Sequence, residues 1–171
     1  LYLYQTSDYS RARVFTNKYG FMVQSVSPDG NFVALSKSNS NSDSDLFIAD
    51  LRLKTTKPKR ISNPDGNIMY AAYTFTPDST QLLYSTNEFG EYNQAWIYDL
   101  KTETHSENVV APWDVSFSYF SKDGKYQVTG INADSQTQLS IRNTYNNTAL
   151  ALPELPSGDL HGVSFSNDNR V

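Results

Sequence analysis

One turn motif recurs four times along this chain and constrains its fold more than any other feature of the sequence. The clearest copy covers Ser27–Gly30 and reads SPDG. Its aspartate returns as Asp29, Asp78, Asp123 and Asp168, at steps of 49, 45 and 45 residues. A repeat period of about 40–50 residues is typical of the blades of a β-propeller, each of which is one small sheet. The spacing therefore predicts an all-β chain that forms part of a β-propeller.

Each copy of the motif has the chemistry of a tight turn between two strands. Proline presets φ for the first corner, and aspartate can bond the backbone two residues further on. Glycine or asparagine tolerates the positive φ that the exit of such a turn requires. We therefore predict a structural role for the turn residues Asp29, Gly30, Asp78, Asp123, Gly124 and Asp168.

Short β-type runs on either side of each turn predict a unit of four strands. The first complete unit has its strands at 22–26, 32–36, 46–51 and 60–62, with a polar loop at 37–44. The third unit has its strands at 115–120, 126–130, 139–143 and 149–152, with a loop at 132–137. Strands separated by turns at this spacing favour four-stranded antiparallel blades.

Counting these units divides the chain into about three whole blades and two partial ones, within a single partial propeller domain. The predicted parts are 1–20 (outer strands of a blade), 21–66, 67–113 and 114–158 (whole blades), and 159–171 (the start of a further blade, with an inner strand at 162–165). A chain that starts with Leu1 rather than Met and divides in this way is expected to be part of a longer protein.

An open arc of blades leaves an inter-blade face uncovered at each end. A closed propeller has only short, protected edges because its last blade joins its first. In the arc, apolar side chains such as Leu3 and Phe165 would line the uncovered faces. Large apolar faces and free strand edges tend to associate, so we expect this fragment to self-associate.

Two other all-β folds also string short strands together. A β-sandwich has strands every 8–12 residues, but nothing in that fold calls for one turn motif at a constant period. A β-solenoid does repeat, usually with a shorter period and fewer turns in each unit. The period of the motif favours the propeller over both.

The composition excludes several classes of partner and site. The chain of 171 residues has a net charge of −4 and no basic patch, so neither nucleic acid nor an anionic membrane surface is an expected partner. It has no cysteine, which excludes disulfides and cysteine-based metal sites. No apolar run approaches the roughly 20 residues that span a bilayer. We predict no cofactor and no metal.

Three segments of the first whole blade resemble a known propeller repeat. They are Ser27–Leu35 (SPDGNFVAL), Ser44–Leu51 (SDLFIADL) and Lys59–Ser62 (KRIS). The repeat is similar to that of the TolB-like periplasmic proteins and to that of the N-terminal propeller of the prolyl oligopeptidase family of serine peptidases. The resemblance covers nearly the whole chain.

Three further segments look most like bacterial members of the peptidase family: Thr6–Tyr9, Ser38–Asp45 and Trp113–Val115. In that family the propeller caps a separate C-terminal α/β-hydrolase domain, restricts the access of peptide substrate to it and performs no bond chemistry. The resemblance thus implies a non-catalytic gating domain with a hydrolase domain and a peptide as its partners. It favours a periplasmic or secreted location and leaves a cytoplasmic one open.

The sequence also lacks the parts of a hydrolase active site. No glycine pair brackets a serine in the G-x-S-x-G pattern that would hold the nucleophile. The histidines are His105, predicted to lie in a solvated turn, and His161, which precedes the last inner strand and could face the channel. With no recognisable Ser or Asp partner for either, we predict no catalytic residue.

Two groups of polar residues are candidate binding sites. Asn39, Asn41, Asp43 and Asp45 alternate as in a Ca²⁺ loop, but the glycine and glutamate of an EF-hand loop are missing, so we interpret them as a polar loop. The second group shares the face of the predicted propeller that carries the blade-joining loops, where acidic and aromatic groups could bind a peptide with a cationic amino terminus. Its members are Glu88, Glu91, Trp113 and Asp114. Trp113 could instead pack between blades.

Three functions therefore stay open. The first is the non-catalytic propeller of a prolyl oligopeptidase-like serine peptidase, which gates substrate access and docks a hydrolase domain. The second is a TolB-like interaction propeller without enzymatic activity. The third is an independent ligand-binding or sugar-binding propeller.

Overall fold

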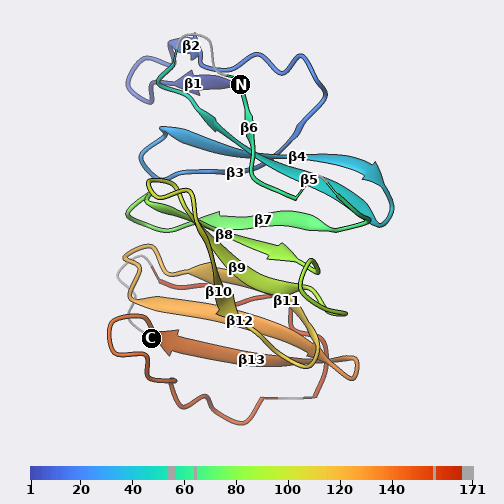
Figure 1. Cartoon of the computed structure of the whole chain (residues 1–171). Helices are drawn as coiled ribbons and strands as arrows, with labels where there is room; N and C mark the ends of the chain where they lie inside the picture. Colours follow the sequence, from blue (N-terminus) through green and yellow to red (C-terminus); the bar gives the residue numbers. More distant parts are fainter. Residues whose placement is uncertain (54–56, 64, 156, 167–171) are drawn as a thin grey trace.

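The computed structural model describes residues 1–53, 57–63, 65–155 and 157–166, and every regular element within these ranges is a β-strand. The strands pair antiparallel in four sheets that follow one another along the chain (Figure 1). The predicted all-β fold of antiparallel blades is confirmed. In the part of the chain covered by these ranges, no helix is long and apolar enough to cross a membrane.

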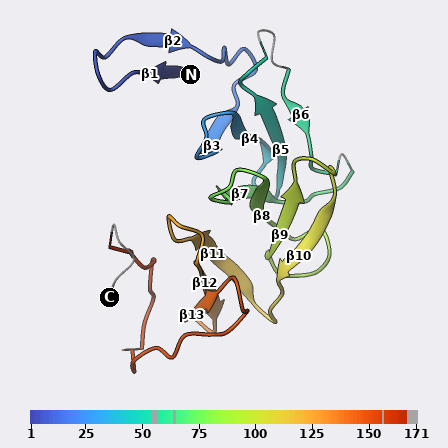
Figure 2. The same cartoon turned by 90° about the vertical axis from the view of Figure 1, so that its left-hand side faces the viewer.

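Two of the sheets are complete four-stranded blades in which sequence neighbours lie side by side. The first contains β3 (Met22–Val26), β4 (Phe32–Ser40), β5 (Asp43–Asp50) and β6 (Lys59–Arg60). The second contains β7 (Tyr70–Phe75), β8 (Gln81–Thr86), β9 (Gln94–Asp99) and β10 (His105–Val109). Figure 2 shows these sheets along an arc, with the first strand of each on the inner side and the last on the outer side.

The third sheet has three strands: β11 (Asp114–Phe120), β12 (Tyr126–Ala133) and β13 (Gln136–Asn143). The strand predicted at 149–152 is wrong, since only one bridge, between Arg142 and Ala149, forms there. Pro153 explains the early end of the pairing, because proline has no N–H to donate to a ladder. The inner strand predicted at 162–165 is also absent as a strand, and this segment is held instead by the Tyr119 hydroxyl, which bonds the backbone of Val163.

A short hairpin opens the chain, with β1 (Tyr2–Tyr4) paired to β2 (Arg11–Arg13). The pairing of β2 ends at Arg13, and the N–H groups of Val14 and Phe15 both donate to the carbonyl of Leu1. Phe15 is buried against the first blade. This contact attaches the hairpin to the rest of the arc.

The loops predicted at 37–44 and 132–137 are mostly strand. β4 and β5 continue to Ser40 and from Asp43, and β12 and β13 are joined by the two residues Asp134 and Ser135. The prediction was wrong because runs of Ser, Asn and Gln look like loops, although their backbones can pair across a hairpin as well as any others.

The hydrophobic core lies between successive blades rather than within one. In β8, the buried side chains of Leu82 and Tyr84 belong to the cluster shared with the first blade, whereas Leu83 belongs to the cluster shared with Val115 of the third sheet. This is the alternation of a strand that is covered on both faces. At equivalent positions before their turns, Phe75 is 2% exposed and Val26 is 45% exposed. Strand β7 of Phe75 packs against the inner strands β3 and β11, whereas in the described part of the chain β3 has an inner strand, β7, on one side only.

Candidate functional site

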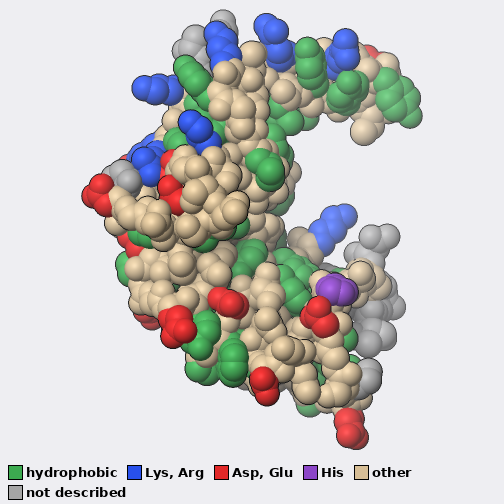
Figure 3. All heavy atoms as spheres, turned by 90° about the vertical axis from the view of Figure 1, so that its right-hand side faces the viewer, with side chains coloured by type: hydrophobic (Ala, Val, Ile, Leu, Met, Phe, Trp, Pro, Cys, Tyr) green, Lys and Arg blue, Asp and Glu red, His purple; other side chains and the backbone are tan. Residues whose placement is uncertain are grey.

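The structure has two contrasting ends of the blades. We call the end with the repeated aspartate turns the turn face; it also carries the loops between third and fourth strands, and lies to the left in Figure 1. We call the opposite end the loop face. It carries the loops between second and third strands and the segments that join blades, and Figure 3 shows it from the front.

The predicted turn aspartates have the same contacts in each described copy. Asp29 accepts a hydrogen bond from the Ser27 hydroxyl at 2.6 Å and from the Asn31 N–H at 3.0 Å. Asp78 and Asp123 accept the equivalent bonds, at 2.6 and 3.2 Å and at 2.7 and 3.0 Å. These hydroxyl and N–H donors hold the pKa of Asp29 and of Asp78 below the ordinary value. Asp168 lies outside the described residues.

The sequence analysis missed the hydroxyl residue two positions before each aspartate. The hydroxyls of Ser27, Thr76 and Ser121 donate to the aspartate and accept a backbone N–H five residues on, at 2.8, 3.0 and 2.9 Å. The signal was present, since every copy of the motif begins with Ser or Thr. At the turn exit Gly30 and Gly124 have φ of 72° and 74°, and Ser79 takes a similar φ of 60°.

On the loop face, two of the predicted peptide-contacting carboxylates have internal partners. Glu88 accepts hydrogen bonds from the Tyr70 hydroxyl at 2.6 Å and from the Asn63 amide at 2.9 Å, which ties the end of one blade to the next. Asp114 accepts the Asn93 N–H at 2.7 Å. These contacts give both carboxylates a structural use at blade junctions.

The other two predicted residues remain accessible. Glu91 is exposed. Trp113 is 38% exposed, with its ring 6.0 Å from that of Tyr92, and its carbonyl accepts the Gln94 amide. The aromatic pair therefore stands at the surface beside the second blade.

The side chain of His105 is exposed, as the sequence suggested, but the residue lies in a strand rather than in a turn. It is the first residue of β10, and its Nδ1 lies 2.7 Å from the hydroxyl of the buried Tyr84. Burial lowers the pKa of His105, and the nearby Glu88 partly opposes this shift. Burial likewise raises the pKa of Tyr70 to about 12, with a further contribution from Glu88.

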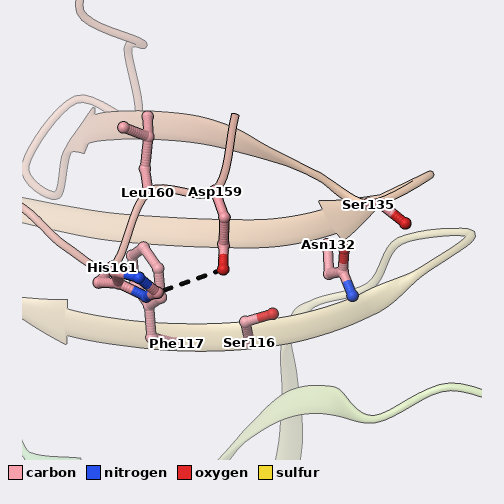
Figure 4. Close-up of a pocket in the computed structure, with 7 residues that line it drawn as sticks. All are labelled: Ser116, Phe117, Asn132, Ser135, Asp159, Leu160 and His161. Atoms are coloured by element: carbon pink, nitrogen blue, oxygen red, sulfur yellow. Dashed lines mark ion pairs between the residues drawn. The ribbon is translucent and has the colours of Figure 1, made fainter. Parts of the chain in front are cut away.

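A trough lies on the loop face beside the inner strands. It consists of two grooves of about 420 and 460 Å³, both lined by Ser116 and Asn132. The first groove lies between the inner strands β7 and β11 and reaches Tyr73, Asn93 and Asp114. The second is lined by Ser116, Phe117, Asn132, Ser135, Asp159, Leu160 and His161 (Figure 4).

Two local backbone features aim side chains into this trough. Ser116 is the extra residue of a β-bulge in β11, which lies seven residues before Asp123, whereas the bulges of β3 and β7 lie five before Asp29 and Asp78. Bulges redirect a side chain and are frequent beside functional sites. Asp134 and Ser135 form a two-residue hairpin with φ of 51° and 61°, and this left-handed pair usually contains glycine.

The polar groups at the middle of the trough have no internal partners in the structure as described. Across the described residues, no hydrogen bond is made by the side chains of Ser116, Asn132 or Ser135. Together they present two hydroxyls and one primary amide, which can both donate and accept. Such neutral groups suit the N–H and C=O of a peptide backbone.

One wall of the second groove is held by Thr137. Its hydroxyl donates to Asp159 at 2.9 Å and accepts the Leu160 N–H at 2.9 Å, which fixes the segment beside β13. His161 Nδ1 lies 3.9 Å from the other oxygen of Asp159, and both side chains are largely exposed. Asp159 thus keeps one carboxylate oxygen open to the solvent in the groove.

Ser116, His161 and Asp159 are the residue types of a hydrolytic triad, but they are not arranged as one. In Figure 4 the Ser116 hydroxyl points toward Asn132. In the described ranges no hydrogen bond joins that hydroxyl to His161. A triad needs the nucleophile within hydrogen-bond reach of its base, so this arrangement does not assemble one.

Two of the four polar residues considered as a Ca²⁺ loop, Asn39 and Asp45, are bonded within the protein. The buried Asp45 pairs with Arg60 and accepts hydrogen bonds from the Asn39 amide and the Ser62 hydroxyl. Within the described part of the chain, no group of three or more His, Asp or Glu side chains could hold a metal ion.

Charge is divided unevenly between the two halves of the arc. Residues 1–66 carry nine of the fourteen Lys and Arg and six of the eighteen Asp and Glu, whereas 67–171 carry the remaining five and twelve. In Figure 3 Lys and Arg gather toward the upper part of the loop face, while Asp and Glu predominate below. The trough therefore lies in the acidic half.

Solved structures with the same fold contain propellers of two kinds. TolB from Acinetobacter baumannii matches with a TM-score of 0.61 and 24% identity, over 86% of this chain and 36% of that one. A puromycin-hydrolyzing peptidase of Mycobacterium tuberculosis matches at 0.66 and 13%, over 87% and 24%. Prolyl oligopeptidase B from Galerina marginata matches at 0.64 and 13%, over 84% and 22%.

At these identities the likeness shows a shared fold. The predicted similarity to the propellers of TolB proteins and of prolyl oligopeptidase-type peptidases is confirmed at that level. The chain spans little more than a third of the length of the TolB structure and about a quarter of each peptidase. No family model and no curated protein matches the sequence.

Proposed function

We propose that this chain is part of the non-catalytic propeller domain of a prolyl oligopeptidase-like serine peptidase. In this role it gates the access of peptides to a separate hydrolase domain and provides a surface on which that domain docks. The trough of the loop face carries the proposal, because it offers unpaired peptide-like hydrogen-bonding groups beside the inner strands and no assembled triad. The fold shared with peptidase propellers supports it.

The alternative is a TolB-like propeller that binds another protein and belongs to no enzyme. The fold shared with TolB proteins supports this second function. Both functions place polypeptide recognition on the loop face. They differ in whether a hydrolase domain is part of the same protein.

The sequence of the whole gene distinguishes the two functions. The peptidase proposal requires that the reading frame around these 171 residues encodes an α/β-hydrolase domain with a G-x-S-x-G elbow. A reading frame that encodes only further blades would instead support the TolB-like function.

Gating itself is tested in the whole enzyme. Deleting the propeller should let the hydrolase domain cleave long polypeptides that the intact enzyme leaves uncut, while short chromogenic peptides are still cleaved. The isolated chain of 171 residues should cleave neither substrate. An unchanged substrate range after the deletion contradicts the gate.

A further inference from the structure

The trough contains a charged position next to its neutral centre, and this combination indicates a more specific ligand than a peptide of any sequence. The inference rests on the proposed function, since it names the kind of polypeptide that the same face would bind. Three observations support it, which concern the neutral centre, the open carboxylate and the surrounding charge.

The neutral centre can bind the main chain of an extended peptide. Asn132 lines both grooves, and its primary amide carries a donor and an acceptor side by side, as a peptide group does. Ser116 lies across from it on the bulge of β11. Because the two grooves meet at this pair, a peptide that crosses from one to the other would pass both side chains.

The open carboxylate lies in the second groove. Asp159 uses one oxygen to accept the Thr137 hydroxyl, and its other oxygen faces the exposed His161 at 3.9 Å. The hydrogen bonds from Thr137 to Asp159 and from Leu160 to Thr137 hold this carboxylate in position before a ligand arrives. A carboxylate fixed in this way suits a guanidinium or ammonium group, which can donate to both oxygens.

The surroundings of Asp159 reinforce this preference. The half of the chain that forms the trough carries twelve acidic and five basic residues, so its field attracts a cation. By contrast, Glu88 is bonded through both of its oxygens, and Asp114 is half-buried and accepts the Asn93 N–H. Asp159 is the more accessible carboxylate of the trough, because 72% of its side chain is exposed and its second oxygen has His161 at 3.9 Å as its nearest partner.

We propose that the trough binds an extended peptide segment carrying a basic residue, with the peptide main chain at Ser116 and Asn132 and its cationic group at Asp159. The neutral centre recognises any sequence, and Asp159 selects among sequences. The aromatic pair of Tyr92 and Trp113 is adjacent in sequence to Asn93 and Asp114, which line the first groove.

The test measures the binding of two peptides to the whole chain by fluorescence anisotropy. Both are fluorescein-labelled decapeptides of Gly, Ser and Ala with blocked ends; one carries a central arginine and the other a central citrulline, which has the same shape without the charge. We expect the arginine peptide to bind about tenfold more tightly, as a charge-assisted bond at a partly exposed site gives.

Three variants assign the effect. Asp159→Asn should abolish the preference for arginine over citrulline. Asn132→Ala should weaken both peptides alike, since the main chain is common to them. The matched control is Asp134→Asn, which removes the same charge from the neighbouring hairpin but not from the groove wall, and it should keep the preference. Circular dichroism confirms that each variant is folded.

The possible results separate this inference from the proposed function. Peptide binding that Asp159→Asn and Asn132→Ala leave unchanged overturns the assignment to the trough, as does the absence of binding by either peptide. If Asp134→Asn loses the preference for the arginine peptide as fully as Asp159→Asn does, the pairing of arginine with Asp159 is overturned. The preference would then come from the overall negative charge of this half of the chain. None of these results bears on the gate, which the propeller deletion tests by itself.

Discussion

The turn face and the loop face use the same strands in opposite ways. On the turn face every described copy of the motif satisfies its polar groups internally, by the same bonds from Ser or Thr to Asp and from Asp to the backbone. On the loop face the connections differ in each blade, and Ser116, Asn132 and Ser135 face the solvent of the trough. In this chain the repeated turn residues have a structural role, and the candidate site lies where the loops differ from blade to blade.

The largest expected effect concerns the assembly of the chain in solution. Tyr2, Leu3, Tyr4, Met22 and Val23 are all exposed at the end of the arc that precedes the first blade. Phe165 at the other end is half-buried and its ring is stacked 6.0 Å from that of Tyr126, so that end is partly covered. We expect the 171-residue chain to self-associate, as measured by light scattering at tens of micromolar. A monomer mass would contradict this.

Gly130 should be the position where the loop face tolerates a change least. A Cβ there would overlap the Phe117 ring. Overpacking of this kind costs about 1–3 kcal/mol, so Gly130→Ala should lower the free energy of unfolding by an amount in that range, as measured in urea. The double variant with Phe117→Leu should recover part of the loss. No loss in Gly130→Ala would show that the trough wall is looser than the ring contact implies.

The turn aspartates should matter for stability and not for binding. We expect Asp29→Ala and Asp78→Ala each to lower the free energy of unfolding by about 1 kcal/mol, through the lost turn hydrogen bonds. Glu91→Ala on the loop face, which removes an exposed carboxylate, should leave the melting temperature unchanged. Equal melting temperatures for all three variants would contradict the structural role of the turn aspartates.

The same aspartates make the turn face sensitive to acid. Hydrogen bonds from Ser27 and Thr76 depress the folded-state pKa of Asp29 and of Asp78 below the ordinary value of an aspartate. A depressed carboxyl pKa contributes stability that is present above the unfolded pKa and is lost as pH falls through the folded one. Urea unfolding should therefore show a loss of stability below about pH 4, and this loss should be smaller in the Asp29→Asn, Asp78→Asn double variant. An identical pH dependence would contradict the assignment.

The smallest expected effect is a gain in stability at the hairpin of the trough. Ser135 holds a φ of 61°, which costs a non-glycine residue about 1–2 kcal/mol, and glycine would avoid this cost while losing more chain entropy. We expect Ser135→Gly to raise the free energy of unfolding by about 0.5–1 kcal/mol. A melt that falls instead would show that the hydroxyl has a structural role.

The fold was predictable from sequence to the extent that local chemistry determined it. The aspartate turns, the inner strand β3 and the order of the strands follow from turn residues and apolar runs. The hydroxyls of Ser27, Thr76 and Ser121 were equally visible but were not recognised as part of the motif. The predictions that were wrong depended on tertiary context. The hydrophilic halves of β12 and β13 were predicted to be a loop, although they pair as strands. A fourth strand was predicted before Pro153, where only one bridge forms.

The candidate site was less predictable because it depends on which polar groups find internal partners. The sequence alone assigned Glu88 and Asp114 to the loop face. It could not show that the Tyr70 hydroxyl would donate to Glu88 and the Asn93 N–H to Asp114. Nor could it show that a bulge aims Ser116 into a groove or that Asp159 is held beside β13. The sequence suggested that His161 could face the channel and gave no partner for it, whereas the structure has Asp159 beside it at 3.9 Å.

The placement of the core between blades has a consequence for how the chain comes apart. The blade of β7–β10 is packed on both sides, through Leu82 and Tyr84 on one and Leu83 on the other, whereas the blade of β3–β6 has a full neighbour on one side only. In such an array, stability is shared between nearest neighbours as in a one-dimensional chain of coupled units. Amide hydrogens of β8 should therefore exchange most slowly with solvent, and opening should spread inward from the ends, one blade after another.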